Sequence, residues 1–499
     1  MAPRLRALAV RWMLWAAINR VGQDALRLGG RLVLARLLWP DAFGLFTLAM
    51  VVVATIKAGC QLEFSKPIVQ RESPSAELLS TAFWSQTALG ATGTLALAAL
   101  AGPLGLLTGQ SQVAALLQVL AVQVLLGGVS VVPRAWLWRE GAFRQMANRA
   151  LLAEAVGAVA AVTTAMAGGG VWSFVVQELV SDVVALFVLW AIVPWRPRLH
   201  WASAEFSELF RFGWPLLGKR GLDLVSQEGD RFLVGRIFGP DALGLYALAL
   251  RVVEALARSI GTVFERVAFP AFARTQDDPR RSRLGFLEAV RFQAVLTFPP
   301  LIGVALLAGD LVPFVLGPHW AGAVPLTGVL AARALVSALL ILPGAVLLGR
   351  GRPWHILALG LCSVGAFALG WMLGLPWGPL GVATGGLVAA AVLVPIALRL
   401  VTAELGIPIR DWGRALLPAA IGGAAMAVGI GVTRWLLPGT GSEGRTLRLG
   451  AALLVGAISY GLPLAPWLAG ETRRYLALLR QGKASRGAAQ APFPPRGMD

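Results

Sequence analysis

Polar side chains recur at helical spacing inside two otherwise apolar stretches of this 499-residue chain. The first set falls at positions i, i+3, i+4, i+7 and i+11, on one face of a helix: Arg20, Gln23, Asp24, Arg27 and Arg31. The second set begins 200 residues later and repeats that face: Arg220, Asp223, Gln227 and Arg231. Guanidinium groups bind phosphate and carboxylate oxygens through paired hydrogen bonds, so such a face predicts recognition of an anionic group.

Two neighbouring apolar stretches add further charges, with Lys57 in one and Arg251, Glu254 and Arg258 on one stripe of the other. A charge at the centre of a bilayer costs about 2.5–3.5 kcal/mol, so these groups must face a water-filled cavity or one another. Because Arg and Lys outnumber Asp and Glu, we expect a cavity for an anionic ligand between the two halves. The alternative is a set of salt bridges without a ligand, such as Arg20–Asp24 or Arg251–Glu254.

The cavity hypothesis assigns two roles to these side chains. The candidates for substrate binding are Arg20, Gln23, Arg27, Lys57, Arg220, Gln227, Arg251 and Arg258. The candidates for carrying a coupling proton or Na+ are Asp24, Asp223 and Glu254, whose alternative role is to neutralise a neighbouring arginine. The three histidines are scattered and the glycine-rich stretches follow no strand, so we expect no metal site and no cofactor.

The composition predicts an all-α polytopic membrane protein. The chain is 57% hydrophobic and 14% charged, with a mean hydropathy of +0.70, whereas soluble domains carry about 25% charged residues. Apolar runs long enough to cross a bilayer leave no room for a soluble catalytic domain, so we expect a transporter and not an enzyme. The net charge of +18 does not indicate nucleic-acid binding, because the basic residues lie mainly between apolar runs. Fourteen spans are predicted, at residues 12–38, 43–65, 79–101, 112–134, 147–167, 171–193, 208–236, 243–268, 285–308, 322–346, 354–374, 379–401, 412–434 and 448–468.

The loop charges predict the orientation of these spans. Six of the seven odd-numbered loops contain no Lys or Arg, and Arg445 lies in the exception. The even-numbered loops are basic, so the positive-inside rule places both termini in the cytoplasm. The segment after residue 469 ends in "GKASRGAAQAPFPPRGMD", which is basic and proline-rich, and we expect this tail to be disordered.

A duplicated element divides the chain. The segment "RLVLARLLWPDAFGLFTLAM" from Arg31 and the segment "RFLVGRIFGPDALGLYALAL" from Arg231 share nine identities over twenty aligned positions. Each copy is expected to form a helix–turn–helix elbow at the outer face, as scaffold. Because the first helix of the second half comes six spans after the first helix of the chain, an even number, the repeat is parallel. The predicted division is lobes at 1–195 and 196–402, two added helices within 403–468 and a tail at 469–499. Near the outer ends, Arg31, Arg36 and Arg231 are expected to anchor at the membrane interface.

Several soft motifs also occur in a characteristic order: "ARLLWPDAFGLF", "GGGVWSFVVQELV", "PWRPRL", "FRFGWPLL", "GDRFLVGRIFGPDALGLYALALRV", "FPAFARTQDD", "VLGPHWAGA" and "LLGRGRPW". Through them the chain resembles, over residues 10–465, the Wzx-like polysaccharide flippases of the multidrug/oligosaccharidyl-lipid/polysaccharide exporter superfamily. The resemblance implies two six-helix lobes, two added helices and a central cationic cavity. It also implies flipping of an undecaprenyl-diphosphate-linked oligosaccharide across the bacterial cytoplasmic membrane by alternating access, often ion-coupled, alongside a polymerase and other components of polysaccharide assembly.

Two other transporter functions share this architecture, and an enzyme of polysaccharide synthesis is a third alternative. A lipid II flippase for peptidoglycan synthesis would have similar charges. A cation-coupled multidrug antiporter should carry acidic and aromatic cavity residues, which the basic excess argues against. A polymerase or glycosyltransferase would need a large outer loop or a soluble domain, and the outer loops here are short.

Overall fold

The structure is a computed structural model that describes residues 22, 26–71, 74–274, 278–437 and 442–488. Within these ranges all regular secondary structure is helical and no strand occurs. An apolar chain in lipid must satisfy its backbone hydrogen bonds within each segment, which helices do. The predicted all-α class is confirmed.

The first bundle, here called the N-lobe, begins with a helical segment over residues 26–37. An elbow at Leu38 and Trp39 leads into α2, which starts at a proline in its first turn. Proline suits a helix start because its missing N–H would have no partner there. The labelled helices of this bundle are α2 (Pro40–Cys60), α3 (Ser65–Gln70), α4 (Ala76–Thr108), α5 (Ser111–Leu120), α6 (Val122–Arg139), α7 (Phe143–Met166) and α8 (Trp172–Ile192).

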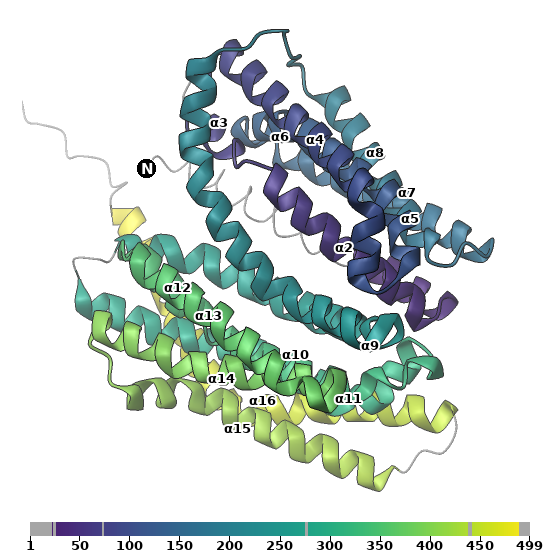
Figure 1. Cartoon of the computed structure of the whole chain (residues 1–499). Helices are drawn as coiled ribbons and strands as arrows, with labels where there is room; N and C mark the ends of the chain where they lie inside the picture. The colour runs from purple at the N-terminus through teal and green to yellow at the C-terminus, as the bar shows by residue number, and fades with distance from the viewer. Residues whose placement is uncertain (1–21, 23–25, 72–73, 275–277, 438–441, 489–499) are drawn as a thin grey trace, which may run out of the picture.

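The longest helix, α9 (Ser203–Arg274), connects the two bundles. Near its start, Leu209 packs in one apolar cluster with Leu78 of α4, and near its end Phe272 packs in another with Val346. Figure 1 shows α9 running between the two bundles. Gly239 interrupts α9 with φ 85° and ψ −179°, a conformation that glycine adopts without a Cβ penalty, and this break forms the second elbow.

The second bundle, here called the C-lobe, comprises α9 and the helices up to α14, and two more helices pack beside α10. The bounds are α10 (Pro279–Val315), η1 (Pro318–Trp320), α11 (Ala323–Ala338), α12 (Ile341–Gly349), α13 (Pro353–Gly374), η2 (Leu375–Trp377), α14 (Gly378–Leu405), α15 (Ile409–Leu436) and α16 (Ser442–Ala488).

Eleven helical segments of the described chain are long and apolar enough to cross a membrane. Two of them match two predicted spans each. One is Arg220–Arg258, which contains the break at Gly239, and the other is Trp354–Leu405, which contains α13 and α14. The first predicted span, 12–38, lies partly outside the described residues. Large apolar side chains such as Phe187 and Met166, each 76% exposed, lie on the outer surface as expected for lipid contact.

The C-terminal segment differs from its prediction. We expect disorder after residue 469, whereas α16 continues to Ala488. The segment "ETRRYLALLRQGKAS" is rich in good helix formers such as Leu, Ala, Arg and Lys. The prolines that favoured disorder all come later, at positions 492, 494 and 495, outside the described residues.

The two elbows cross each other and join the lobes. A Cβ built on Gly44 would lie 1.8 Å from the carbonyl oxygen of Pro240, and a Cβ on Gly244 would lie 1.8 Å from that of Pro40. Only glycine permits this reciprocal approach of two backbones. The duplicated elbow, predicted as scaffold within each half, is therefore the contact between the halves.

Further bonds close the same end of the molecule. The indole N–H of Trp320, a buried side chain, donates to the carbonyl oxygen of Ala35 at 2.7 Å. Arg36 donates to the last carbonyls of α10, at 2.6 Å to Phe314 and 2.7 Å to Val315. The elbow end is thus tightly joined, and the space between the lobes lies beyond it.

Candidate functional site

A cavity of about 320 Å³, here called the central cavity, lies between the two lobes. One wall comes from residues 26–37, α2 and α8, and the other from α9, so it lies between the halves as the sequence predicts. Its charged lining comprises five arginines and three glutamates: Arg27, Arg31, Arg231, Arg251, Arg258, Glu178, Glu228 and Glu254. The excess of cations favours an anionic ligand.

On the N-lobe wall, arginines of the first helical segment pair with glutamates of later helices. Arg27 pairs with Glu154 of α7, and Arg31 donates to Glu178 of α8 at 3.0 Å. The Arg31 side chain is only 12% exposed. These pairs hold the first segment against α7 and α8 while leaving its polar face toward the cavity.

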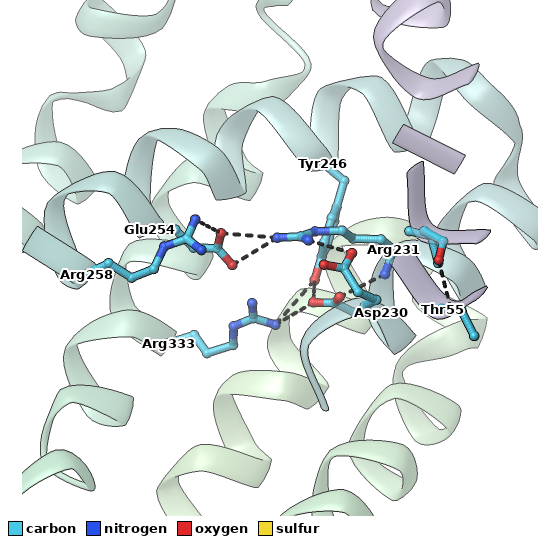
Figure 2. Close-up of polar contacts among 9 residues, drawn as sticks. Thr55, Asp230, Arg231, Tyr246, Glu254, Arg258 and Arg333 are labelled. Carbon is cyan, nitrogen blue, oxygen red and sulfur yellow. Dashed lines mark hydrogen bonds and ion pairs between the residues drawn. The ribbon is translucent and has the colours of Figure 1, made fainter. Parts of the chain in front are cut away.

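On the C-lobe wall, one glutamate accepts from two arginines, as Figure 2 shows. Arg231 lies 2.6 Å from Glu228 and 3.0 Å from Glu254, and Arg258 donates to Glu254 at 2.7 Å. Arg251 also lines the cavity, and it forms no ion pair with any residue that the structure describes. Arg251 is therefore the lining cation most available to a ligand.

Behind this wall, Asp230 is 1% exposed and accepts two hydrogen bonds from other side chains. The guanidinium of Arg333 on α11 and the hydroxyl of Tyr246 both donate to its Oδ2 at 2.8 Å. In Figure 2 both donors point toward Asp230. A buried carboxylate needs such partners, and this cluster joins α11 to both arms of α9.

The structure contains two further pockets, one in each lobe. The N-lobe pocket, of about 140 Å³, lies between α2, α6, α7 and α8 and includes Lys57. The C-lobe pocket, of about 370 Å³, lies between α9, α11, α12 and α13 and is mainly apolar. It includes Gln227, and it shares Glu254 and Arg258 with the central cavity.

The structure divides the predicted site residues among these spaces. Arg27, Arg251, Arg258 and Glu254 line the central cavity, whereas Lys57 and Gln227 line the N-lobe and C-lobe pockets. Three further predicted residues lie outside the described part of the chain: Arg20, Gln23 and Asp24.

Arg220 and Asp223 are not among the described residues that line the central cavity. Arg220 forms an ion pair with Glu63 at 3.3 Å, and Asp223 is exposed. Both precede Arg231 by two to three helical turns, about 12–17 Å at 1.5 Å per residue, so they share its face of α9 but lie beyond the cavity.

The prediction that Arg31 and Arg231 anchor at the membrane interface is wrong. Both side chains are nearly buried, at 12% and 13% exposure, and both pair with glutamates beside the central cavity. Arg36 does lie near the outer end, but it caps α10 across the lobe boundary instead of extending to lipid. Glu178, the partner of Arg31, comes from another helix, which the periodicity of one helix cannot reveal, whereas Glu228 lies three residues before Arg231 on the same helix.

Several charged residues of the site were not among the predicted ones: Glu154, Glu178, Glu228, Asp230, Arg333, Arg134, Arg149 and Asp182. Most of them are charges inside long apolar runs, which is the same signal that identified Lys57. Applied to every charge in every apolar run, including Glu228 and Asp230 in the first run of the second half, it would have found them.

Comparison with known proteins connects this geometry to a family. Residues 33–325 match the family described as polysaccharide biosynthesis proteins. The succinoglycan biosynthesis transport protein ExoT of Rhizobium meliloti is 26% identical over 360 residues, which cover 71% of this chain and 73% of that protein. The lipopolysaccharide biosynthesis protein WzxC of Escherichia coli is 25% identical over 344 residues, 68% of this chain and 69% of that protein.

A solved structure shares the fold. The lipid II flippase MurJ in an inward closed conformation superposes with a TM-score of 0.72 at 13% identity, covering 92% of this chain and all of that one. The match to the family spans more than half of the chain and includes both elbows and most of the central-cavity lining. This chain is therefore a multi-pass membrane protein of the polysaccharide biosynthesis protein family.

Proposed function

We propose that this protein flips an undecaprenyl-diphosphate-linked oligosaccharide from the cytoplasmic to the outer leaflet for polysaccharide export. The observation that carries the proposal is the central cavity between the lobes, with five arginines against three glutamates. A diphosphate offers oxygens in the geometry that guanidinium groups bind in pairs. Membership of the polysaccharide biosynthesis protein family supports a substrate that contains sugars.

The charges suggest how the diphosphate is held. Arg31 and Arg231 each already face a glutamate, so their positive charge is partly neutralised. Arg251 has no such partner among the described residues and acts as the main ligand of the diphosphate. Arg27 and Arg258 complete the site from opposite walls.

The protein works in the bacterial cytoplasmic membrane with both termini in the cytoplasm. The basic even-numbered loops support this orientation, which makes the elbow end the outer end. With the elbows crossed, the central cavity then faces the cytoplasm, where lipid-linked oligosaccharides are assembled. Transport follows by rocking the lobes until the elbows separate and the cavity opens outward.

Translocation needs no covalent step, so the protein acts as a secondary-type transporter without a cofactor. A proton or Na+ drives the cycle, and Glu254 is the proposed carrier among the described candidates, because it lies between Arg231 and Arg258 on the cavity wall. Its neutralisation would remove one carboxylate partner from Arg258 and leave Arg231 paired with Glu228. The polymerase and other assembly components receive the flipped substrate in the outer leaflet.

The test is transport in proteoliposomes containing the purified full chain. A fluorescent undecaprenyl-diphosphate oligosaccharide in the inner leaflet should reach the outer leaflet faster than in protein-free vesicles. We expect Arg251→Gln to lower this rate about tenfold or more, because one charge-assisted hydrogen bond contributes roughly 1.5–3 kcal/mol. The control is Arg399→Gln, which removes an exposed arginine of α14.

Two other substrates decide between the alternatives. Lipid II belongs in the assay because the MurJ fold is shared, and a cationic dye probes for drug export. Faster movement of lipid II than of the oligosaccharide would reassign the substrate. Export of the dye alone would reject flipping of an anionic lipid. An unchanged rate in the Arg251→Gln variant would reject Arg251 as the main ligand of the diphosphate.

A further inference from the structure

The N-lobe pocket is a second polar space that the central cavity does not include. Its polar lining comes from four helices and one residue that follows a helix: Lys57 on α2, Gln61 directly after α2, Ser130 and Arg134 on α6, Arg149 on α7 and Asp182 on α8. Among the described residues, none lines both spaces. At about 140 Å³ the pocket far exceeds the space that one water molecule needs.

The pocket lies one to two helical turns from the central cavity along shared helices. On α8, Glu178 lines the central cavity, and Asp182 and Ala185 line the pocket. These steps of four and seven residues correspond to about 6–10 Å at 1.5 Å per residue. The two linings therefore lie close together along α8, at a spacing that an elongated ligand can span.

The charges of the pocket are unbalanced. Three cations, Lys57, Arg134 and Arg149, face one carboxylate, Asp182. No ion pair joins any of these four groups to another residue that the structure describes. This excess of positive charge among the described lining residues favours an anionic ligand.

The hydrogen bonding of Arg149 is also incomplete. Its Nη1 donates to the carbonyl oxygen of Ala185 at 3.4 Å, and its Nε is buried without a partner. Arg134 is exposed although its neighbours Pro133 and Ala135 on α6 are buried, so its guanidinium faces the pocket. Both arginines line the pocket and form no ion pair with a residue that the structure describes, so their charge is available to a ligand.

We propose that the N-lobe pocket binds the carboxylate of an acidic sugar in the lipid-linked oligosaccharide, on the second sugar from the diphosphate. The inference rests on the proposed function, in which the diphosphate occupies the central cavity. Arg134 and Arg149 bind the carboxylate, while Gln61 and Ser130 offer an amide and a hydroxyl to the sugar hydroxyls. The pocket makes the protein selective for acidic repeat units.

The experiment uses two synthetic undecaprenyl-diphosphate disaccharides that differ by one group. One carries glucuronate as the second sugar and the other carries glucose. We measure the affinity of each for the purified full chain and its flipping rate in proteoliposomes. The wild-type protein should bind the glucuronate probe about tenfold or more tightly than the glucose probe, as one charge-assisted contact provides.

Substitutions in the N-lobe pocket test whether Arg134 and Arg149 cause the preference for the glucuronate probe. Arg134→Gln and Arg149→Gln should each remove most of it while leaving the affinity for the glucose probe unchanged, which also shows that the variant is folded. Arg149→Lys should restore part of it, because the charge is kept. In contrast, Arg251→Gln should weaken both probes by the same factor.

Three results would overturn the assignment. Equal binding of the two probes by the wild type would show that the pocket does not read the carboxylate. Equal losses for both probes in Arg134→Gln and Arg149→Gln would place these arginines in diphosphate binding or folding. If the wild type neither binds nor flips either probe, the proposed function itself fails, and this inference fails with it.

Discussion

The two copies of the duplicated element are alike at the elbow and differ at the central cavity. At the elbow, the copies make the same contact in reverse: Gly44 meets Pro240, and Gly244 meets Pro40. At the cavity, positions 200 residues apart differ in charge. Glu228, Asp230 and Glu254 correspond to Leu28, Gly30 and Ala54.

This difference shows which structural requirements apply to both halves of the chain. Two backbones that cross within contact distance require glycine on each side, so the elbow is alike in both copies. The charged centre has no such requirement, because an arginine needs only some carboxylate nearby. In the C-lobe, α9 supplies it through Glu228 and Glu254, whereas in the N-lobe α7 and α8 supply Glu154 and Glu178.

The largest expected effect concerns the asymmetric centre. Asp230→Ala would leave the guanidinium of Arg333, whose side chain is 14% exposed, without a carboxylate partner. Breaking a buried pair in this way costs about 3–5 kcal/mol, so we expect a large loss of unfolding free energy. Thermal and chemical unfolding of the purified protein in detergent measure it.

A double variant supplies the control for Asp230. Because two apolar side chains replace a buried pair with little loss, Asp230→Ala combined with Arg333→Met should recover most of the lost stability. If Asp230→Ala alone stays within about 1 kcal/mol of the wild type, the cluster is not a stability element of the C-lobe, and the proposed contrast between the lobes loses its main support.

Much of this comparison was accessible from the sequence. The all-α class, the duplicated elbow and a charged space between the halves follow from composition, identity and helical spacing. Arg251, Arg258 and Glu254 were found because three charges on one stripe of an apolar helix need a shared polar environment.

The ion pairs of the N-lobe could not be predicted from the sequence in this way. Glu154 and Glu178 approach Arg27 and Arg31 only through the packing of α7 and α8, more than a hundred residues away in sequence. The crossing of the elbows depends on tertiary geometry as well. Glycine in "PDAFGL" is equally compatible with close packing inside one half and between halves, and the sequence does not distinguish them.

An intermediate effect is expected at the symmetric elbow. Gly44→Ala and Gly244→Ala each place a Cβ where a carbonyl oxygen of the other elbow lies, so the elbows must move apart. Overpacking of this kind costs about 1–3 kcal/mol, which corresponds to roughly a 5–150-fold shift toward a separated elbow. Because the contacts are reciprocal, the two variants should give shifts of similar size.

Spin labels at Leu37 and Ile237, which are 46% and 51% exposed, can report the elbow separation by double electron–electron resonance. The two native cysteines, Cys60 and Cys362, are replaced by alanine for this measurement. Gly59→Ala serves as the control, because a Cβ at Gly59 on the same helix meets nothing within 4 Å. A shift in only one of the two elbow variants would show that the contact is not reciprocal.

The smallest effect tests whether the symmetry extends to the arginines that flank the elbow. Arg36 donates to two terminal carbonyls of α10, and its counterpart Arg236 lies over Gly109 at the end of α4 without a hydrogen bond to a carbonyl there. A cation at a helix C-terminus contributes about 0.3–1 kcal/mol, so Arg36→Gln should shift the same spin-label distribution about two- to fivefold toward separation. Arg236→Gln should shift it less, because it forfeits only the interaction with the helix dipole, and Arg399→Gln should not shift it. An equal or larger shift in Arg236→Gln would extend the symmetry from the glycines to the arginines and confine the asymmetry to the cavity.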